Sequence, residues 1–421
     1  MKKMMVAVAA LSLGMALPSL AAAGVGDESA EEIKKELEYL RLKMSSQMER
    51  VEHLEDQLKK QGEKSGKVVL ANEFIDQLTL KGDLRVRYER RELDYKETNA
   101  SEKDQDRWRT RFRVGGIWNN KAEDWQVGAG LATGSDDPTS TNDTWSEDKP
   151  FETGDIRLDY AYAAHKWQDF MFTLGQQNNP YETSWVMWDG DVRLAGITGQ
   201  YGKKEGLFAT LGGYAAKLVA SDNTATLTAG QLGYRGKAAD AKYTLAAGYH
   251  TFSKSLINEG SATFNLGTVD ENMYELNIGD LYGKVSFPVA QAKLALVGHV
   301  WKNFGADGAA GTSQASTYTG KPEDADTGYA LGIEATIDKF KVGYDYSVVE
   351  ADSLFGYLAD SDFGDGLSDT NKKGHRVQLG YNMTKNWSAG VTWLNYERDE
   401  DTGTTGVDSV DLYQFDVNYK F

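Results

Sequence analysis

The sequence predicts an all-β fold, a 16-stranded antiparallel transmembrane β-barrel preceded by a short α-helical coiled coil. Three observations support this. Apolar and polar side chains alternate from about residue 78 to the C-terminus, the connections between the alternating segments are short and long in turn, and a heptad pattern precedes them.

Composition excludes several classes of protein. The 421 residues include 46 Lys and Arg against 63 Asp and Glu, for a net charge of −17, whereas nucleic-acid binding needs a basic surface. The absence of Cys excludes disulfides and thiolate chemistry, and five His leave little for zinc. We therefore expect no metal site, no cofactor and no nucleic-acid partner.

The first 23 residues have the pattern of a secretory signal peptide. Lys2 and Lys3 precede an apolar stretch over residues 4–17, and Ala21 to Ala23 supply small residues for cleavage. We expect residues 1–23 to be removed and the protein to leave the cytoplasm.

Residues 28–62 predict a coiled coil. Apolar residues follow one another in steps of four and three, and Gln47 alone interrupts them: Ile33, Leu37, Leu40, Met44, Val51, Leu54 and Leu58. A stripe this narrow needs a partner helix, so we expect self-association, as a dimer or a trimer. Residues 63–74 predict a linker.

From residue 75 to 421 the pattern has the period of a β-strand. Trp108, Phe112 and Trp118 share one face of a strand, and the residues between them include Arg109 and Arg111. About 16 such segments alternate with seven short connections and eight long ones. Sixteen segments need 15 connections, so these counts fit a meander of antiparallel hairpins.

A soluble β-sandwich and a membrane barrel both use such alternation. The strands are about 10–14 residues long, which exceeds the ~5–6 usual in soluble sheets and favours the barrel. Aromatic residues near strand ends predict an interfacial girdle: Trp118, Trp125, Trp167, Phe170, Trp301, Phe340 and Trp387.

The last strand carries the most specific motif. Aromatic and apolar residues take every second position up to the terminus: Tyr413, Phe415, Val417, Tyr419 and Phe421. This row resembles the C-terminal assembly signal of bacterial outer-membrane proteins.

Together these features resemble the general-diffusion porins of Gram-negative outer membranes, and most closely porins that carry a coiled coil before the barrel. The resemblance implies a homotrimer in outer-membrane lipid. Each barrel would hold a water-filled channel for small hydrophilic solutes and ions, and the coiled coil would lie in the periplasm, where it could contact the cell wall.

A basic wall is expected on the inner face of the first two strands. Its members alternate with the apolar row: Arg85, Arg87, Arg109, Arg111 and Arg113. Guanidinium stays protonated at working pH, and walls of fixed charge set ion preference in pores. The set resembles the arginine cluster of the general porins.

The third long connection, about residues 175–191, is the candidate constriction loop. Trp185, Val186, Met187 and Trp188 are too apolar for an exposed loop, so we expect it to fold into the barrel. Its carboxylates would then face the arginine wall: Glu182, Asp189 and Asp191. A surface loop packed on a neighbouring subunit is the alternative.

Two other long connections are acidic, around residues 136–148 and 352–369, and predict a hydrated acidic surface. Asp360 and Asp362 have the spacing that opens a calcium loop, but Asp365 and Asn371 stand where Gly and Glu are needed.

No catalytic residues are predicted, because the sequence lacks GxSxG, phosphate-loop and HExxH motifs and its His residues have no nucleophile at a suggestive spacing. A different function remains open, in which the coiled coil acts as an adhesin or a cell-wall tether and the barrel only anchors it in the membrane.

Overall fold

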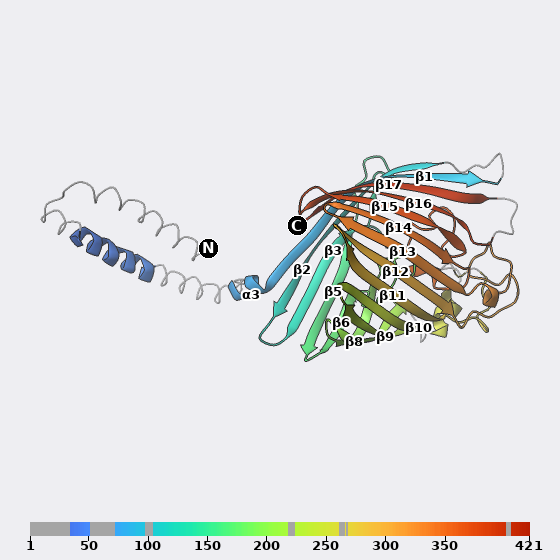
Figure 1. Cartoon of the computed structure of the whole chain (residues 1–421), viewed down its shortest axis with the longest axis horizontal. Coiled ribbons are helices and arrows are strands. Elements are labelled where there is room, and N and C mark those ends of the chain that lie inside the picture. Colours follow the sequence, from blue (N-terminus) through green and yellow to red (C-terminus); the bar gives the residue numbers. More distant parts are fainter. Residues whose placement is uncertain are drawn as a thin grey trace. The chain divides into compact units, whose positions relative to one another are not determined.

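The computed structural model describes residues 34–50, 72–96, 104–217, 224–260, 266, 268–400 and 406–421 (Figure 1). The chain divides into two compact units, Met1–Ile75 and Asp76–Phe421. Residues 1–23, expected to be the signal peptide, lie outside the described residues.

In the first unit, residues 34–50 form an α-helix that covers the middle of the predicted coiled coil. Three apolar residues of the seam lie on it, and their exposed fractions are 40% for Leu37, 53% for Leu40 and 61% for Met44. The other seam residues lie outside the described part: Ile33, Val51, Leu54 and Leu58. This helix therefore presents an uncovered apolar stripe within a single chain.

Helix α3 (Asn72–Gln77) begins inside residues 63–74, the range expected to be a linker. Among the residues that the structure describes, no helix has the length and apolar character required to cross a membrane.

The second unit is built from long β-strands joined in chain order. Their bounds are β1 (Leu78–Tyr95), β2 (Gln105–Asn120), β3 (Trp125–Thr133), β5 (Ile156–Trp167), β6 (Phe170–Asn178), β7 (Arg193–Gly202), β8 (Gly206–Lys217), β9 (Ala225–Ala238), β10 (Ala241–Phe252), β11 (Asn277–Val289), β12 (Ala292–Asn303), β13 (Thr327–Ile337), β14 (Phe340–Val349), β15 (Lys372–Asn382), β16 (Trp387–Arg398) and β17 (Val407–Lys420). Shorter elements lie in the loops: β4 (Asp143–Thr144), α4 (Lys254–Gly260), η1 (Pro322–Asp324) and η2 (Gly356–Leu358).

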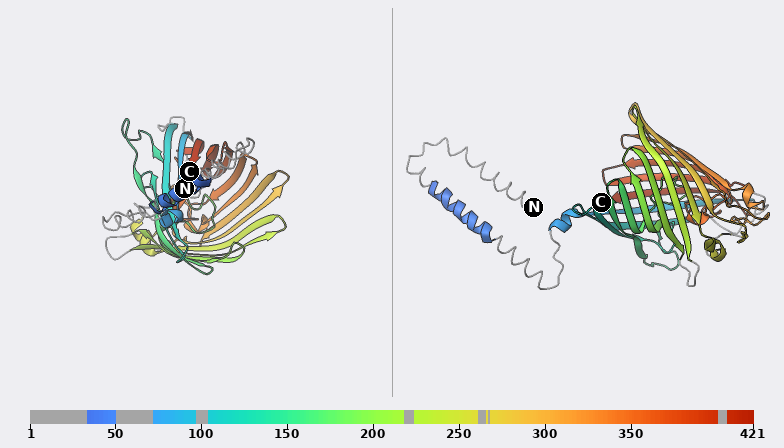
Figure 2. Two further views of the ribbon diagram at one scale, coloured as in Figure 1. Left: turned by 90° about the vertical axis from the view of Figure 1, so that its left-hand side faces the viewer. Right: turned by 90° about the horizontal axis from the view of Figure 1, so that it is seen from below.

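Each long strand pairs antiparallel with its neighbours, and β1 also pairs with β17 from Asp83↔Lys420 to Tyr95↔Val407. This last pairing closes the sheet into a barrel (Figure 2). The two-residue strand β4 pairs only with β2, so the closed wall has 16 strands and the predicted fold is confirmed.

The outside of the barrel is apolar. Leucine and isoleucine side chains on successive strands are more than half exposed: Leu174, Ile197, Leu207, Leu211, Leu232, Leu245, Leu281 and Leu331. Their neighbours along each strand point inward, as the period of two requires. A soluble sandwich would bury these rows against a second sheet, so the sandwich alternative is wrong. Exposed rows of this kind are suited to hydrocarbon.

Most of the predicted girdle residues lie at strand ends near the short connections, with exposed fractions of 43% for Trp125, 57% for Trp167, 51% for Phe340 and 44% for Trp387. Trp301 is different, because only 1% of it is exposed and it packs in the interior cluster. The prediction that Trp301 belongs to the girdle is therefore wrong. Its strand position points inward, toward the third long loop.

The terminal Phe421 completes the seam between the first and last strands. Its backbone N–H donates to the carbonyl of Gly82, and its own carbonyl accepts from the Gly82 N–H, both at 3.1 Å. A Cβ added at Gly82 would lie 2.3 Å from the Phe421 ring, so only glycine leaves room for this aromatic side chain.

Candidate pore constriction

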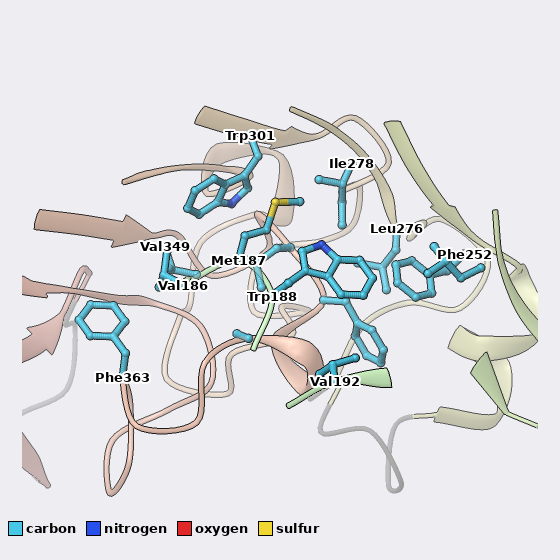
Figure 3. Close-up of a cluster of buried hydrophobic side chains, with 14 of the residues drawn as sticks. Val186, Met187, Trp188, Val192, Phe252, Leu276, Ile278, Trp301, Val349 and Phe363 are labelled. Carbon is cyan, nitrogen blue, oxygen red and sulfur yellow. The ribbon is translucent and has the colours of Figure 1, made fainter. Parts of the chain in front are cut away.

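The third long loop, residues 179–192, folds into the barrel. Val186, Met187 and Trp188 are 0%, 3% and 5% exposed and belong to one large cluster of buried apolar side chains. The cluster includes Phe252 of β10 and Trp301 of β12 (Figure 3). The predicted inward fold agrees with this packing, although residues 175–178 belong to β6 and not to the loop.

A buried polar chain attaches the loop to the wall at β10, β11 and β12. The Ser184 hydroxyl lies 2.8 Å from Nδ1 of His299, and the Ser184 N–H donates to the same nitrogen at 3.2 Å. Nδ1 is therefore an acceptor, and Nε2 of His299 donates to Asp280 at 3.2 Å. Asp280 also accepts from Nε2 of His250 at 3.0 Å. The loop is thus held by directional bonds as well as apolar packing.

Ser184, His299 and Asp280 have the connectivity of a hydrolytic triad, which the sequence spacing did not reveal. Their exposed fractions are 4%, 2% and 5%, and the ring of Trp301 lies 5.2 Å from that of His299. A nucleophile must reach a substrate carbonyl, and this hydroxyl is enclosed. We interpret these hydrogen-bonded side chains as an anchor for the loop.

The beginning of the loop is fixed to β9. The backbone N–H of Glu182 donates to the side chain of Gln231 at 2.9 Å, and Gln231 donates back to the Glu182 carbonyl at 2.8 Å. The Glu182 carboxylate accepts from Arg235 at 2.7 Å. Glu182 therefore does not face the predicted arginine wall, contrary to the sequence-based expectation.

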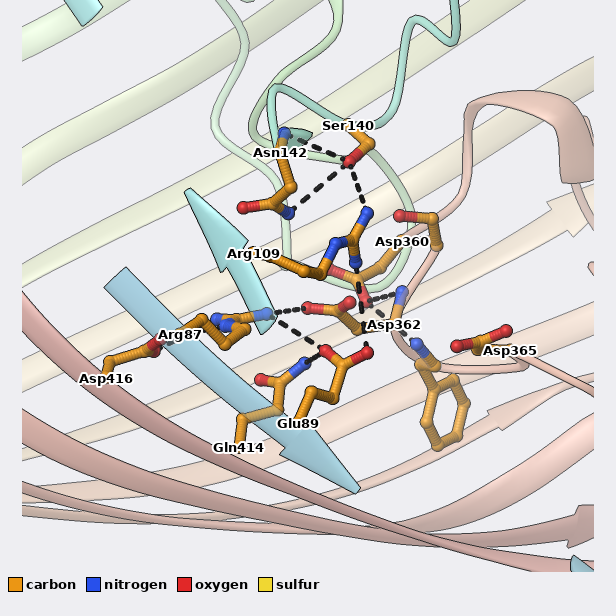
Figure 4. A network of polar contacts seen from close by, with 12 residues as sticks. Arg87, Glu89, Arg109, Ser140, Asn142, Asp360, Asp362, Asp365, Gln414 and Asp416 are labelled. Atoms are coloured by element: carbon orange, nitrogen blue, oxygen red, sulfur yellow. Dashed lines mark hydrogen bonds and ion pairs between the residues drawn. The ribbon is translucent and has the colours of Figure 1, made fainter. Parts of the chain in front are cut away.

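The five predicted arginines do lie together on the inner face of β1 and β2. The register places Arg85 opposite Arg111 and Arg87 opposite Arg109. Arg87 is 4% exposed and donates to Asp416 of β17 through Nε at 2.8 Å and Nη2 at 3.0 Å (Figure 4). A bidentate pair of this kind fixes the guanidinium in place.

Two carboxylates hold the end of the wall near the short connections. Asp83 accepts from Arg111 and Arg113, each at 2.9 Å. Asp191 of the third loop accepts from Arg113 at 3.2 Å and from the Thr141 hydroxyl at 2.7 Å. Although burial opposes ionisation, the Thr141 hydrogen bonds and the charges of Arg111 and Arg113 lower the pKa of Asp191. Of the loop's three predicted carboxylates, Asp191 alone contacts the predicted arginines.

Another long loop, residues 350–371 between β14 and β15, also enters the barrel. Leu354 and Phe363 are 1% and 0% exposed and join the same apolar cluster as the third loop. Asp362 contacts Arg87 at 3.1 Å (Figure 4). Asp365 contacts Arg91 at 2.6 Å and also contacts Arg107. The prediction of a hydrated acidic surface is therefore wrong for this segment.

The two inward loops contact each other directly. The Asp189 N–H donates to the carbonyl of Leu358 at 2.9 Å, and the Asp360 N–H to the carbonyl of Val186 at 3.4 Å. Burial raises the pKa of Asp189, and the neighbouring carboxylate of Asp360 raises it further. Burial likewise raises the pKa of Asp360. Raised pKa values favour the protonated forms of these carboxyl groups, which reduces charge repulsion where the loops meet.

Sequence analysis did not assign five residues to the charged wall: Arg91, Arg107, Asp362, Asp365 and Asp416. Arg107 continues the alternation of the predicted wall by one inward position, and Arg91 follows on β1 after Glu89, so the pattern itself could have included them. The apolar residues of SLFGYLADSDF, residues 353–363, resemble those that singled out the third loop. The pairing of Asp416 with Arg87 depends on barrel closure, and no local signal reports it.

The model of a protein family described as "Putative porin" matches residues 92–276. Among solved structures, OprB of Pseudomonas putida has a TM-score of 0.55 at 10% identity, over 86% of this chain and 97% of that one. OmpF of Salmonella typhi has a TM-score of 0.50 at 14% identity, over 82% of this chain and 97% of that one. A search of curated proteins found no match.

The closed barrel, its apolar exterior and its charged interior define a membrane β-barrel. The family match bears out the resemblance to porins that the sequence suggested. At 10% and 14% identity, the solved structures add support for the fold alone.

Replacing His299 with Ala should loosen the third loop, because Ser184 and Asp280 both lose a buried partner at a cost of about 1–3 kcal/mol. We expect larger and noisier single-channel currents in a planar bilayer. His375→Ala is the matched control, since His375 also contacts a hydroxyl, that of Tyr344 at 2.9 Å, at an exposed position. Currents of wild-type size and noise from His299→Ala would show that the hydrogen bonds of His299 do not hold the loop.

Proposed function

We propose that this chain forms a water-filled channel for passive diffusion of small hydrophilic solutes and ions across a bacterial outer membrane. The observation that carries the proposal is a charged, loop-narrowed interior inside a closed barrel with an apolar exterior. The family match supports the same function.

Within this function, the basic wall of Arg85, Arg87, Arg109, Arg111 and Arg113 would line the narrow part of the channel. Asp191 would face it from the third loop, 3.2 Å from Arg113. Opposite charges across a narrow aqueous passage produce a transverse field that orients polar solutes. Asp189 would join the two inward loops through its backbone bond to Leu358. Glu182 would hold the third loop to the wall through Arg235.

A planar bilayer tests the channel directly. Wild-type protein should give ohmic conductance, and proteoliposomes should take up small sugars. Replacing Arg109, Arg111 and Arg113 with Gln should shift the reversal potential in a salt gradient toward cations, because three fixed positive charges leave the wall.

The matched control replaces Lys203, Lys204 and Lys237 with Gln, which removes the same charge at exposed positions near short connections. This control should leave the reversal potential close to that of the wild type. A barrel that conducts nothing would contradict the channel and favour a membrane anchor. Equal shifts in both variants would contradict the placement of the wall in the channel.

We propose that the terminal row of Tyr413, Phe415, Val417, Tyr419 and Phe421 is read as the assembly signal of an outer-membrane protein. Phe415 and Val417 are 47% and 45% exposed on the outside of the barrel. Deleting Phe421 should reduce the folded, heat-modifiable form in outer membranes. Gly82→Ala crowds the same ring and leaves the terminus intact. Equal loss in both variants would mean that packing at the seam, and not a terminal signal, explains the defect.

We propose that the helix over residues 34–50 is part of a periplasmic coiled coil that assembles the chain as a homotrimer. Its support is the exposed stripe of Leu37, Leu40 and Met44. The same helix favours a second function, as a tether to the cell wall. Both chain ends would lie on the periplasmic side, because the barrel has an even number of strands.

Deleting residues 28–62 should reduce the mass of the detergent-solubilised oligomer, measured by light scattering, and leave the conductance of each barrel unchanged. Charge reversal at Glu38 and Glu49, which lie on the side of the helix away from the apolar stripe, serves as the control. Retention of oligomer mass and of cell-wall sedimentation after the deletion would contradict both roles of the helix.

A further inference from the structure

Loop 350–371 is fixed inside the barrel along most of its length. The ring of Phe363 lies 5.5 Å from that of Trp185 in the third loop and 5.4 Å from that of Tyr396 on β16. The Tyr396 hydroxyl donates to the carbonyl of Asp365 at 2.7 Å. Gln314 donates to the carbonyl of Leu354 at 2.8 Å. These contacts hold the loop's acidic residues at defined positions.

The acidic residues of this loop fill guanidinium sites on the inner wall. Arg87 directs Nη1 to Asp362 at 3.1 Å while its other donors bind Asp416. Arg91 and Arg107 both bind Asp365. The side chains of Asp362 and Asp365 are 28% and 20% exposed, so water reaches them only in part.

Ionisation of Asp362 is favoured by its neighbours. Although burial opposes the charge, the guanidinium of Arg87 holds the pKa of the Asp362 carboxyl well below its usual range. The charges of Arg109 and Arg85 act in the same direction. Asp362 therefore carries a negative charge at neutral pH, opposite the guanidinium of Arg87.

The third loop supplies much less charge to this wall. Its Asp191 contacts Arg113, whereas its Glu182 is held at Arg235 on the opposite side. Without loop 350–371, Arg91 would lose its contact with Asp365, Arg107 would keep only Glu89, and Arg87 would keep Asp416 and Glu89. Guanidinium forks of this geometry bind carboxylate and phosphate groups in two-point contacts.

We infer that loop 350–371 is the internal counter-charge of the arginine wall, and that Asp362 and Asp365 determine the ion preference of the channel. This inference rests on the proposed channel function and adds residues that select solutes. The two carboxylates occupy the sites that a carboxylate or phosphate solute would take. The wild-type channel consequently discriminates weakly between small anions and cations in spite of its many arginines.

The test is the reversal potential of single channels in a KCl gradient. Asp362→Asn with Asp365→Asn keeps the shape of both side chains and removes both charges. The permeability ratio of chloride to potassium should rise roughly tenfold, the order expected when two unit charges leave the wall of a narrow aqueous passage. Succinate, used as a probe dicarboxylate, should block the current of this variant at lower concentrations than it blocks the wild type.

The matched control is Asp307→Asn with Asp324→Asn, which removes the same charge from exposed positions of loop 304–326. It should leave the chloride preference near the wild-type value. Heat-modifiable mobility on gels establishes that each variant is folded, and Asp365→Asn alone provides a milder change if the double variant does not fold.

A double variant that conducts with the wild-type or control reversal potential would overturn the inference and leave the channel function intact. A rise in conductance with no change in ion preference would also overturn it, because the loop would then act only by its volume. Absence of conductance in the wild-type protein is a separate result, which would contradict the channel itself.

Discussion

Backbone hydrogen bonding in hydrocarbon is the constraint on which the rest of the structure depends. A sheet that meets lipid must leave no edge with unsatisfied N–H and C=O groups, and the pairing of β1 with β17 removes both edges. Closure then divides the side chains of every strand between lipid and interior. Residues such as Leu84 and Tyr88 face outward, so their neighbours Arg85 and Arg87 have no alternative to the inner face.

The interior is organised by loops that bring their own apolar residues. Val186 and Met187 from one loop and Leu354 and Phe363 from another pack on inward-facing side chains of the wall and form a core inside the barrel. The core of a soluble domain stabilises the fold, whereas this core also holds the loops in place inside the barrel. It positions polar groups, among them Ser184 and Asp362, at fixed places in an otherwise aqueous space.

Most of the barrel could be predicted because alternation is a local property. Arg109 and Trp108 differ by one position, and that difference alone decides which side of the wall each occupies. The basic wall followed from the same rule. The constriction was predictable in part, since Trp185 and Trp188 marked their loop as apolar.

Partners across the barrel were not predictable. Glu182 and Asp191 lie nine positions apart in one loop, yet they bind arginines of different strands, Arg235 and Arg113. Asp362 belongs to an acidic stretch that looks like a solvated surface until the fold of Leu354 and Phe363 brings it inward. These pairings depend on the curvature of the closed sheet and on the path of each loop, which no local pattern encodes.

The bond between Arg87 and Asp416 joins the first strand of the wall to the last. Asp416 is synthesised more than three hundred residues after Arg87. Until the final strand docks, the guanidinium lacks its bidentate partner and must remain in water. Full pairing of Arg87 and completion of the wall are therefore the same event. An incompletely closed intermediate would leave the guanidinium of Arg87 without Asp416 at its open edge, which keeps that edge hydrated and unsuited to lipid until the last strand arrives.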